Sequence, residues 1–277
     1  MPEFAASRPP AHEAHKRYRV QGFLSPIRVI SPDAAARIAD MVAGIETRYG
    51  AEGGDMLRSN THFLFPELFD LVCSAAILDH VEKILGPDIL CWSASFFSKP
   101  PQDPSFVSWH QDLTYWGLEP ADIVTAWVAI TPSTKTNGCM RVLPGSHRPG
   151  QLGHGDTFAA NNLLSRGQVL AVEVDETEAV DLLLRPGEMS LHHVLVVHGS
   201  EPNRSEQPRH GFAIRYIPTY CRQIGGRTTA LLVRGEDHHN HFDPVPRPLA
   251  DMHADAVAFR AKANKAVKAI LMDGAKN

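Results

Sequence analysis

Nine short β-rich runs, separated by proline and glycine turns, follow one another between residues 89 and 217. Many short strands at this spacing are typical of a β-sandwich or a β-barrel. One such unit can account for all 277 residues, because all-β folds of this length commonly form a single domain. The runs are residues 89–98, 106–110, 123–131, 138–143, 168–174, 180–184, 189–191, 194–198 and 211–217.

Helical patterns flank the β-rich region on both sides. Residues 34–49 follow the capping sequence Ser31-Pro32-Asp33, and their apolar side chains recur at helical spacing. A glycine-rich break follows, and then residues 66–85 form a second helical pattern that stops at Gly86-Pro87. We therefore expect a mainly β fold with flanking helices, two of them packed around one β-barrel. The expected single domain covers 1–277, with a flexible arm over 1–20, N-terminal helices over about 31–87, a β core over about 88–220 and a helical tail over about 251–274.

Charge and cysteine usage exclude several classes of protein. The formal net charge of −4 provides no basic surface, so we expect no nucleic-acid partner. The first residues lack the apolar core of a secretory signal, so we expect none. Nowhere do 18 apolar residues run together, so we also expect no transmembrane helix. The four cysteines are scattered without metal-ligand spacing, which predicts free thiols in a reducing compartment. We expect a cytoplasmic protein that acts on a small molecule and has no membrane partner.

The 15 histidines prompt a search for a metal site. Along an extended strand, residues two apart point to the same face, so His110 and Asp112 are expected to present an imidazole and a carboxylate side by side. These are two of the three ligands of the 2-His-1-carboxylate triad, which binds iron(II) and leaves coordination positions open. The pair occurs often by chance, however, and a histidine paired with its neighbour at a strand end is the commoner explanation.

A third ligand has to come from a distant strand. The apolar run Val194–Val197 is expected to be a strand that ends in His198, which suits a ligand at the rim of a dry cavity. His192 and His193 precede this run and fit a loop. The cluster His238–His241 lies among acidic residues and is expected to be a solvated surface loop.

Arg209 lies 11 residues after His198, at the start of an expected strand. Its guanidinium could hold a carboxylate through two parallel hydrogen bonds, which is the geometry that an oxo-diacid co-substrate requires. Ser200 shares the strand parity of His198 and could add a hydroxyl donor. Arg215 is the alternative anchor, and a surface ion pair is the ordinary fate of either arginine.

Several motifs in one order carry a resemblance to a known family. His110-Gln111-Asp112, Trp127, the segment 137–147, His198-Gly199-Ser200 and Arg209 together resemble the phytanoyl-CoA dioxygenase family over about residues 88–220. The resemblance implies a double-stranded β-helix (a cupin-like jelly roll) and the use of Fe(2+), 2-oxoglutarate and O2. It implies iron ligands His110, Asp112 and His198, and co-substrate contacts Arg209, Ser200, Trp127 and Gln111.

The retained carboxylate indicates the type of reaction. Halogenating relatives replace it with a small residue, whereas this chain keeps Asp112, so hydroxylation of an unactivated C–H bond, with release of succinate and CO2, is expected. The expected substrate is a small polar or anionic metabolite. Three alternatives remain open: an acyl-CoA hydroxylase of the same family, a non-catalytic metal-binding β-barrel, and a zinc or manganese isomerase or hydrolase. The candidate substrate contacts are Arg58, Asn60, His62 and Tyr115.

Overall fold

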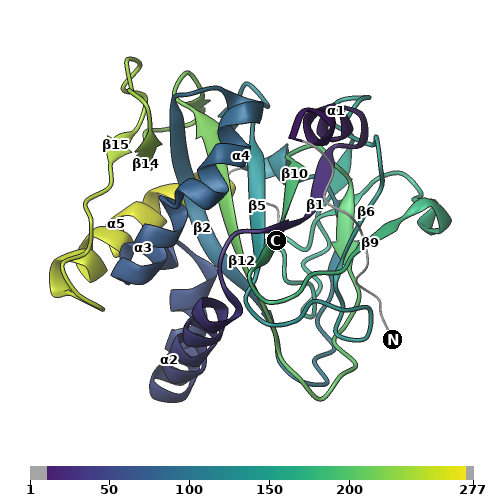
Figure 1. The fold of residues 1–277 in the computed structure, drawn as a ribbon, viewed down its shortest axis with the longest axis horizontal. Helices are drawn as coiled ribbons and strands as arrows, with labels where there is room; N and C mark the ends of the chain where they lie inside the picture. Colours follow the sequence, from purple (N-terminus) through teal and green to yellow (C-terminus); the bar gives the residue numbers. More distant parts are fainter. Residues whose placement is uncertain (1–10, 273–277) are drawn as a thin grey trace. The chain divides into compact units, whose positions relative to one another are not determined.

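The structure is a computed structural model, and it describes residues 11–272. The helices are α1 (Ala11–Gln21), α2 (Pro32–Arg58), α3 (Pro66–Val72), α4 (Ala75–Leu85) and α5 (Ala254–Leu271), with the 3-10 helices η1 (Thr61–Phe63), η2 (Asp112–Tyr115) and η3 (Glu176–Glu178) (Figure 1). The strands are β1 (Phe23–Arg28), β2 (Ile89–Lys99), β3 (Val107–His110), β4 (Leu118–Glu119), β5 (Val124–Ala129), β6 (Met140–Val142), β7 (His154–Gly155), β8 (Val169–Leu170), β9 (Val180–Leu182), β10 (Glu188–His193), β11 (His198–Ser200), β12 (Arg209–Pro218), β13 (Arg222–Gln223), β14 (Thr229–Arg234) and β15 (Asp243–Pro244).

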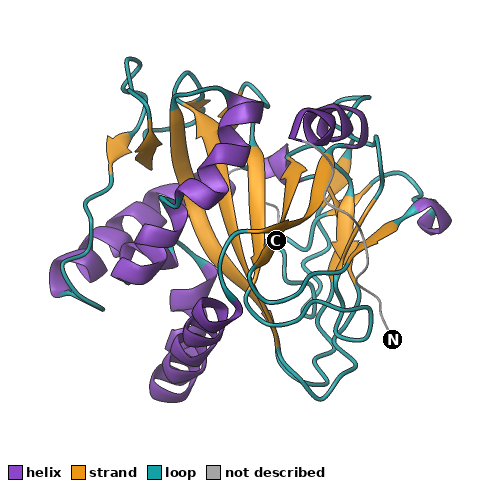
Figure 2. Cartoon of the chain, in the orientation of Figure 1, coloured by secondary structure: helices purple, strands orange, loops and turns teal. Residues whose placement is uncertain are grey.

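The strands form two main sheets and two short pairs. The order of hydrogen-bonded strands is β1-β10-β5-β12-β2-β14-β15 in the seven-stranded sheet and β3-β11-β6-β9 in the four-stranded sheet. The short pairs are β13-β4 and β7-β8. Over residues 11–272 none of these sheets closes on itself, so the expected β-barrel is not a closed one, but the mainly β fold with flanking helices is confirmed (Figure 2).

The chain divides into two compact units, each assembled from three separate segments. The first unit takes Met1–Ala36, Ser98–Thr114 and Trp127–Gly211, and the second takes Arg37–Phe97, Tyr115–Ala126 and Phe212–Asn277. The expected single domain over 1–277 stays a prediction. Among the described residues, no helix combines the length and the apolar character needed to cross a bilayer.

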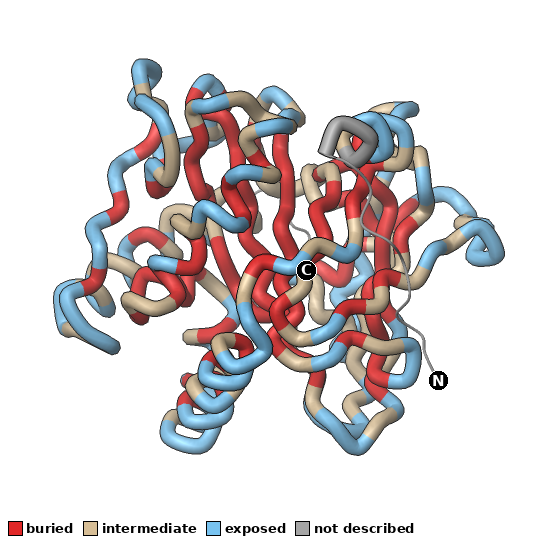
Figure 3. The backbone as a smooth tube through the Cα atoms, viewed as in Figure 1, coloured by how far each residue is buried: buried red, intermediate tan, exposed pale blue. Residues whose placement is uncertain are grey.

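In the first unit, two antiparallel pairings fix the positions of the histidines. β1 pairs with β10 so that Phe23 lies opposite His192, and β11 pairs with β3 so that His198 lies opposite His110. Most of β10 is buried on both faces (Figure 3). The apolar side chains of Met189 and Leu191 alternate along the strand with the buried polar side chains of Ser190 and His192. Buried strands of this kind hold their side chains in fixed rotamers, which is what a metal site needs.

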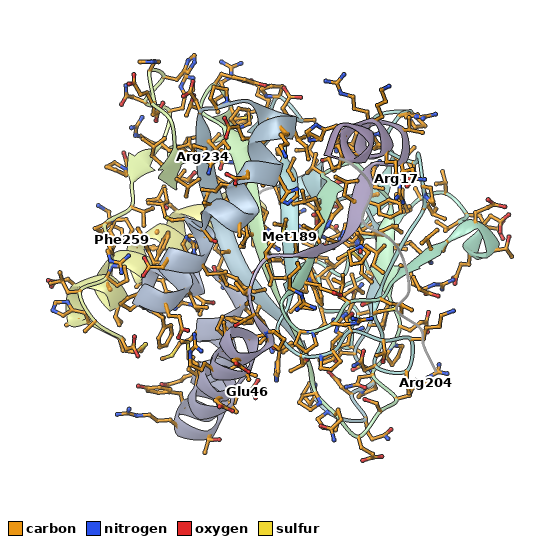
Figure 4. All side chains as sticks on the ribbon, in the orientation of Figure 1. Arg17, Glu46, Met189, Arg204, Arg234 and Phe259 are labelled. Carbon is orange, nitrogen blue, oxygen red and sulfur yellow. The ribbon has the colours of Figure 1, made fainter. Side chains whose placement is uncertain are left out.

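In the second unit, helices pack on strands through apolar faces. The helix α4 buries Ile77, Leu78 and Val81 at helical spacing and ends at Gly86, whose φ of 90° is readily adopted only by glycine. At the end of β14, Arg234 forms ion pairs with two acidic residues of α4, Asp79 and Glu82 (Figure 4).

The helical tail is confirmed as α5. Its Phe259 lies against Phe63 of η1, with the two ring centroids 5.5 Å apart (Figure 4). This contact joins the C-terminal helix to the N-terminal helical region within the second unit.

Three details of the helical predictions are wrong. Residues 11–21 form α1 rather than a flexible arm, and the buried side chain of Tyr18 anchors this helix; the rest of the expected arm, residues 1–10, lies outside the described residues. The first helix is interrupted at Gly50, as expected, because the backbone there is non-helical with a φ of 54°, but the glycine-rich break does not extend over 50–55: a second helical stretch follows at once and reaches Arg58. The helix predicted over 66–85 is two helices, because the backbone of Ser74 is extended and starts α4 anew.

Candidate metal centre

Two histidines and one aspartate converge in the first unit. The rings of His110 and His198 lie side by side across the β3–β11 pairing, with centroids 4.1 Å apart. One carboxylate oxygen of Asp112, Oδ1, lies 3.3 Å from Nε2 of His110 and 4.0 Å from Nε2 of His198. The three ligand atoms all lie within 4.8 Å of one another, so a single metal ion could contact all of them.

The two local predictions behind this site need correction. His110 and Asp112 do not share a strand, because β3 ends at His110 and Asp112 opens η2. The turn is held by the Asp112 backbone N–H, which donates to the Val194 carbonyl at 3.0 Å, and it still brings the carboxylate to the imidazole. The predicted strand over 194–198 is also wrong: residues 194–197 form a buried turn, and His198 starts β11 instead of ending a strand.

The ring hydrogens of both histidines can be assigned from their partners. Nδ1 of His110 lies 3.0 Å from the His198 carbonyl and 2.9 Å from the Ser108 carbonyl, and Nδ1 of His198 lies 3.0 Å from the Val196 carbonyl. A carbonyl only accepts, so each Nδ1 carries the hydrogen and donates. Each Nε2 therefore keeps a free lone pair that faces the Asp112 carboxylate, which is the arrangement of a metal-binding histidine.

The electrostatics keep this site ready for a cation. Burial and the neighbouring His110 lower the pKa of His198 to about 3. Burial alone would raise the pKa of Asp112, but interactions with His110, His192 and His198 outweigh it and hold that pKa well below the usual range. Metal ligands have to be neutral imidazoles and ionised carboxylates, and the pKa shifts of His198 and Asp112 favour these states at neutral pH.

Gln111 lies between the two ligands but points elsewhere. Its side-chain N–H groups donate to the carbonyls of Leu195 at 2.8 Å and Gly150 at 3.0 Å, and its oxygen accepts from the Leu152 N–H at 2.7 Å. The amide is thus occupied by backbone groups of two loops. This explains how the turn around Asp112 is held, while a contact between Gln111 and the co-substrate stays a prediction.

Arg209 lies in the same unit and is short of partners. Its guanidinium is buried, donates to the Gly138 carbonyl at 2.7 Å and lies 5.4 Å from the ring centroid of Trp127. Its Nε–H has no hydrogen-bond partner, and no carboxylate of the described residues lies within 4.0 Å of the guanidinium. Burial lowers its pKa to about 10, so it remains charged at neutral pH. A buried charge without a counter-ion is costly, which indicates a place for an anionic ligand.

Trp127 is positioned by a close approach to the neighbouring strand. A Cβ atom at Gly211 would lie 1.8 Å from the Trp127 ring, so only glycine allows the indole to lie there. The ring is buried and lies under the Arg209 guanidinium. The predicted pair Arg209 and Trp127 is thus brought together, and its contact with 2-oxoglutarate stays a prediction.

A lysine that the sequence reasoning missed lies beside Ser200. The fully buried side-chain nitrogen of Lys99 donates to the Ser200 hydroxyl at 2.7 Å and also to the Glu201 carbonyl. Because the Ser200 oxygen accepts this bond, its own hydrogen is free to donate to a further acceptor. A lysine that ends a long apolar strand directly before Pro100 is a signal that could have drawn attention to it.

Lys99 predicts a specific pH dependence of stability. Burial, followed by the charge of Arg209, lowers its pKa from 10.5 to about 6, whereas the charges of Asp103, Glu201 and Cys139 act in the opposite direction. Between these two values the unfolded chain binds the extra proton, so this residue makes stability increase as the pH rises from about 6 towards 10.5. We expect the stability of Lys99→Met, relative to the unsubstituted protein, to be highest near pH 6 and to fall towards pH 9.

Urea unfolding at several pH values measures this difference. Lys135→Met, at a lysine whose side chain is 63% exposed, is the matched control and should show no such trend. A difference between Lys99→Met and the unsubstituted protein that stays constant from pH 6 to pH 9 would contradict the prediction.

The remaining candidates lie in the second unit. Arg215, the alternative anchor, donates to the Ser95 hydroxyl at 2.6 Å and lies 5.7 Å from the ring centroid of Trp116. Asn60 is buried and donates to Asn264 at 2.9 Å, and the fully buried His62 lies 3.9 Å from the sulfur of Cys91. Arg58 is exposed, and Tyr115 is half-buried at the end of η2. Substrate contact by these residues stays a prediction.

Comparisons with known proteins agree with this geometry. The sequence profile of the family described as Phytanoyl-CoA dioxygenase (PhyH) matches residues 18–211. The human protein "Phytanoyl-CoA dioxygenase, peroxisomal" is 31% identical over 169 residues, which cover 59% of this chain and 50% of that protein. A Stutzerimonas stutzeri protein named "Probable alpha-ketoglutarate-dependent hypophosphite dioxygenase" is 29% identical over 224 residues, which cover 74% of this chain and 77% of that protein. The chain spans about half the length of the phytanoyl-CoA dioxygenases that it matches.

Solved structures of the same fold also match. The apo form of the non-heme monooxygenase ThoJ has a TM-score of 0.83 and 34% identity, and the match covers 92% of this chain and 96% of that chain. The structure described as "CytC3 with Fe(II) and alpha-ketoglutarate" has a TM-score of 0.64 and 22% identity, with 84% of this chain and 97% of that chain covered; at this identity the likeness concerns the fold alone. The double-stranded β-helix is confirmed.

Proposed function

The chain belongs to the phytanoyl-CoA dioxygenase family, and we propose that it is an iron(II)- and 2-oxoglutarate-dependent dioxygenase that hydroxylates an unactivated C–H bond of a small polar or anionic metabolite. The observation that carries this proposal is the pair of Nε2 lone pairs, on His110 and His198, that face a single oxygen of Asp112. Two neutral imidazoles and one carboxylate on one side of an ion leave the other side open for ligands.

The residues present fit both the metal ion and the co-substrate. The donor set of two nitrogen atoms and one oxygen atom suits iron(II), and His198, whose pKa is lowered by burial, does not have to lose a proton to bind it. The unpartnered Nε–H of the buried Arg209 suits a carboxylate, because 2-oxoglutarate brings the counter-ion that the protein does not supply. This fit also favours an oxygenase over a metal-binding barrel without activity, which has no use for such an arginine.

Each residue has a defined task in the proposed reaction. When bound, iron(II), 2-oxoglutarate and O2 supply the oxidation of the substrate, with succinate and CO2 as co-products. Arg209, which donates to the Gly138 carbonyl, would hold a carboxylate of 2-oxoglutarate, and the Ser200 hydroxyl, which accepts from Lys99, would add a donor to that carboxylate. His110, Asp112 and His198 would hold the ion, and the buried apolar turn 194–197, which directly precedes His198, would help to exclude water beside these ligands.

Substrate class and location are part of the same proposal. The Stutzerimonas stutzeri relative, of which 77% is covered, is named for a small anion, whereas only about half of the phytanoyl-CoA dioxygenases is matched. This contrast supports a small polar or anionic substrate over a long acyl thioester.

All four cysteines are free thiols and three of them are buried, which supports a reducing compartment, and we place the enzyme in the cytoplasm.

A coupled assay tests the proposed function. The protein with iron(II), 2-oxoglutarate and O2 is given small polar metabolites, phosphonates and other small anions, and acyl-CoA thioesters, and succinate and O2 uptake are measured. We expect succinate release to rise at least about tenfold with one small polar or anionic compound. Turnover that continues without O2 or without 2-oxoglutarate would rule out the proposed reaction. Turnover only with acyl-CoA thioesters would leave the reaction in place but overturn the proposed substrate class.

A further inference from the structure

We propose that His192 is a positioning residue of the metal centre: its Nε2 carries the ring hydrogen and faces Oδ2 of Asp112 at 3.7 Å, so that only Oδ1 is left for the metal ion. This inference rests on the proposed function, because it assigns a task to a residue next to the proposed ligands. His192 and His193 were expected in a loop, but both are the last residues of β10, the strand that also carries Met189 (Figure 4).

The contact geometry separates the two oxygens of Asp112. Nε2 of His192 lies 3.7 Å from Oδ2, whereas Nε2 of His110 and Nε2 of His198 face Oδ1 at 3.3 and 4.0 Å. The side chain of His192 is only 2% exposed, and its ring centroid lies 4.9 Å from that of His198. Each carboxylate oxygen thus has its own set of neighbours.

Hydrogen-bond partners distinguish His192 from a ligand. In His110 and His198, Nδ1 donates to backbone carbonyls, which frees Nε2 for a metal ion. Nδ1 of His192 is buried and has no hydrogen-bond partner, so no carbonyl directs the ring hydrogen to it. The hydrogen is then best placed on Nε2, where a carboxylate can accept it. His192 also lies outside the set of ligand atoms that are all within 4.8 Å of one another.

The backbone keeps this imidazole in place. Residue His192 lies opposite Phe23 in the β1–β10 pairing, and the next N–H, of His193, donates to the Gly22 carbonyl at 2.8 Å. The carboxylate is held from the other side, because the Asp112 N–H donates to the Val194 carbonyl two residues beyond His192. Donor and acceptor are therefore fixed by a single stretch of chain, residues 192–194.

The expected consequence concerns the number of open coordination positions. A carboxylate whose second oxygen is occupied by an N–H donor binds a metal ion through one oxygen. If that donor is lost, Oδ2 is free to turn to the metal ion and to fill a position that the co-substrate needs. His192 would then act on co-substrate binding without touching metal ion or co-substrate.

The experiment uses Co(II) as the probe metal and needs no turnover. Three proteins are compared: the unsubstituted protein, His192→Leu, which has no donor, and His192→Gln, which retains an N–H at a similar reach. Infrared difference spectra, with and without Co(II), report one- or two-oxygen binding from the separation of the two carboxylate stretches. Visible absorption of Co(II) gives the affinity for the metal ion and, by titration, for 2-oxoglutarate.

We expect His192→Leu to show the smaller stretch separation of two-oxygen binding and an affinity for 2-oxoglutarate weakened about tenfold, and we expect His192→Gln to restore both. If His192→Leu keeps the original separation and affinity, the inference is wrong. If His192→Leu fails to fold, His192→Met is used in its place, since it also has no N–H donor in its side chain. His147→Leu, at a half-buried histidine outside the site, is the matched control. Failure of the metal centre itself is distinguishable, because His110→Ala would then bind Co(II) as tightly as the unsubstituted protein.

Discussion

His110→Ala is expected to abolish both metal binding and succinate release. Substituting a residue that merely orients a metal ligand typically lowers affinity or activity 10- to 100-fold, so removing a ligand should cost more than about 100-fold. The His110 ring is fixed in orientation, because its Nδ1–H faces two backbone carbonyls and its Nε2 lone pair is left for the metal ion. We therefore expect a larger loss of metal affinity than from substituting a surface histidine. Co(II) titration measures the affinity, and the coupled assay measures turnover.

Asp112→Asn separates charge from shape at the same site. It keeps the size of the side chain but removes the negative charge, so we expect weakened Co(II) binding. Because interactions with three histidines stabilise the ionised carboxylate, we also expect a lower thermal unfolding temperature at neutral pH. His238→Ala is the control, since that histidine is 73% exposed and lies in a polar loop. Full turnover by either His110→Ala or Asp112→Asn would show that the metal centre lies elsewhere in the chain.

Arg209→Leu is expected to weaken binding of 2-oxoglutarate by about 30-fold or more. Removing one partner of a buried, hydrogen-bonded charge pair typically costs about 2–5 kcal/mol. The affinity for Co(II) should stay unchanged, because Arg209 is not a metal ligand. If Arg209 stabilises bound 2-oxoglutarate equally in the ground state and in the transition state, KM for 2-oxoglutarate rises while kcat at saturation is retained.

Three further variants make the arginine test specific. Arg209→Lys keeps the charge but loses the planar pair of donors, so an intermediate loss is expected. Arg204→Leu removes a surface arginine, 76% exposed, and should bind 2-oxoglutarate normally (Figure 4). Arg215→Leu tests whether Arg215 is the arginine that binds 2-oxoglutarate. If this variant loses 2-oxoglutarate binding and Arg209→Leu retains it, Arg215 and not Arg209 binds the co-substrate.

The secondary structure was predictable where the pattern is local. The repeating apolar residues of α4 and the stop at Gly86 depend only on neighbours in the chain, and the structure agrees with both. The turn at 194–197 was missed because four consecutive apolar residues are equally compatible with a buried strand. The run is buried, as its apolar composition favours, but its backbone conformation depends on what packs against it.

Part of the candidate site was also local. His110 and Asp112 are two residues apart, so almost any turn or strand keeps their side chains near each other, even though the predicted strand was wrong. By contrast, the placement of His192 beside Asp112 and of Lys99 beside Ser200 has no local signal. These contacts arise between segments that are far apart in the chain.

The sequence by itself determined the chemistry that is available: two imidazoles, one carboxylate and one arginine in an order that resembles a known family. Only the tertiary structure decided which nitrogen of each imidazole is free, which oxygen of Asp112 faces the histidines, and that Arg209 is buried without a counter-ion. The physical reason is that alternation along a strand gives the face of each side chain but not its neighbour on the next strand. Strand register is set by backbone hydrogen bonds between distant segments, such as the one that places His198 opposite His110.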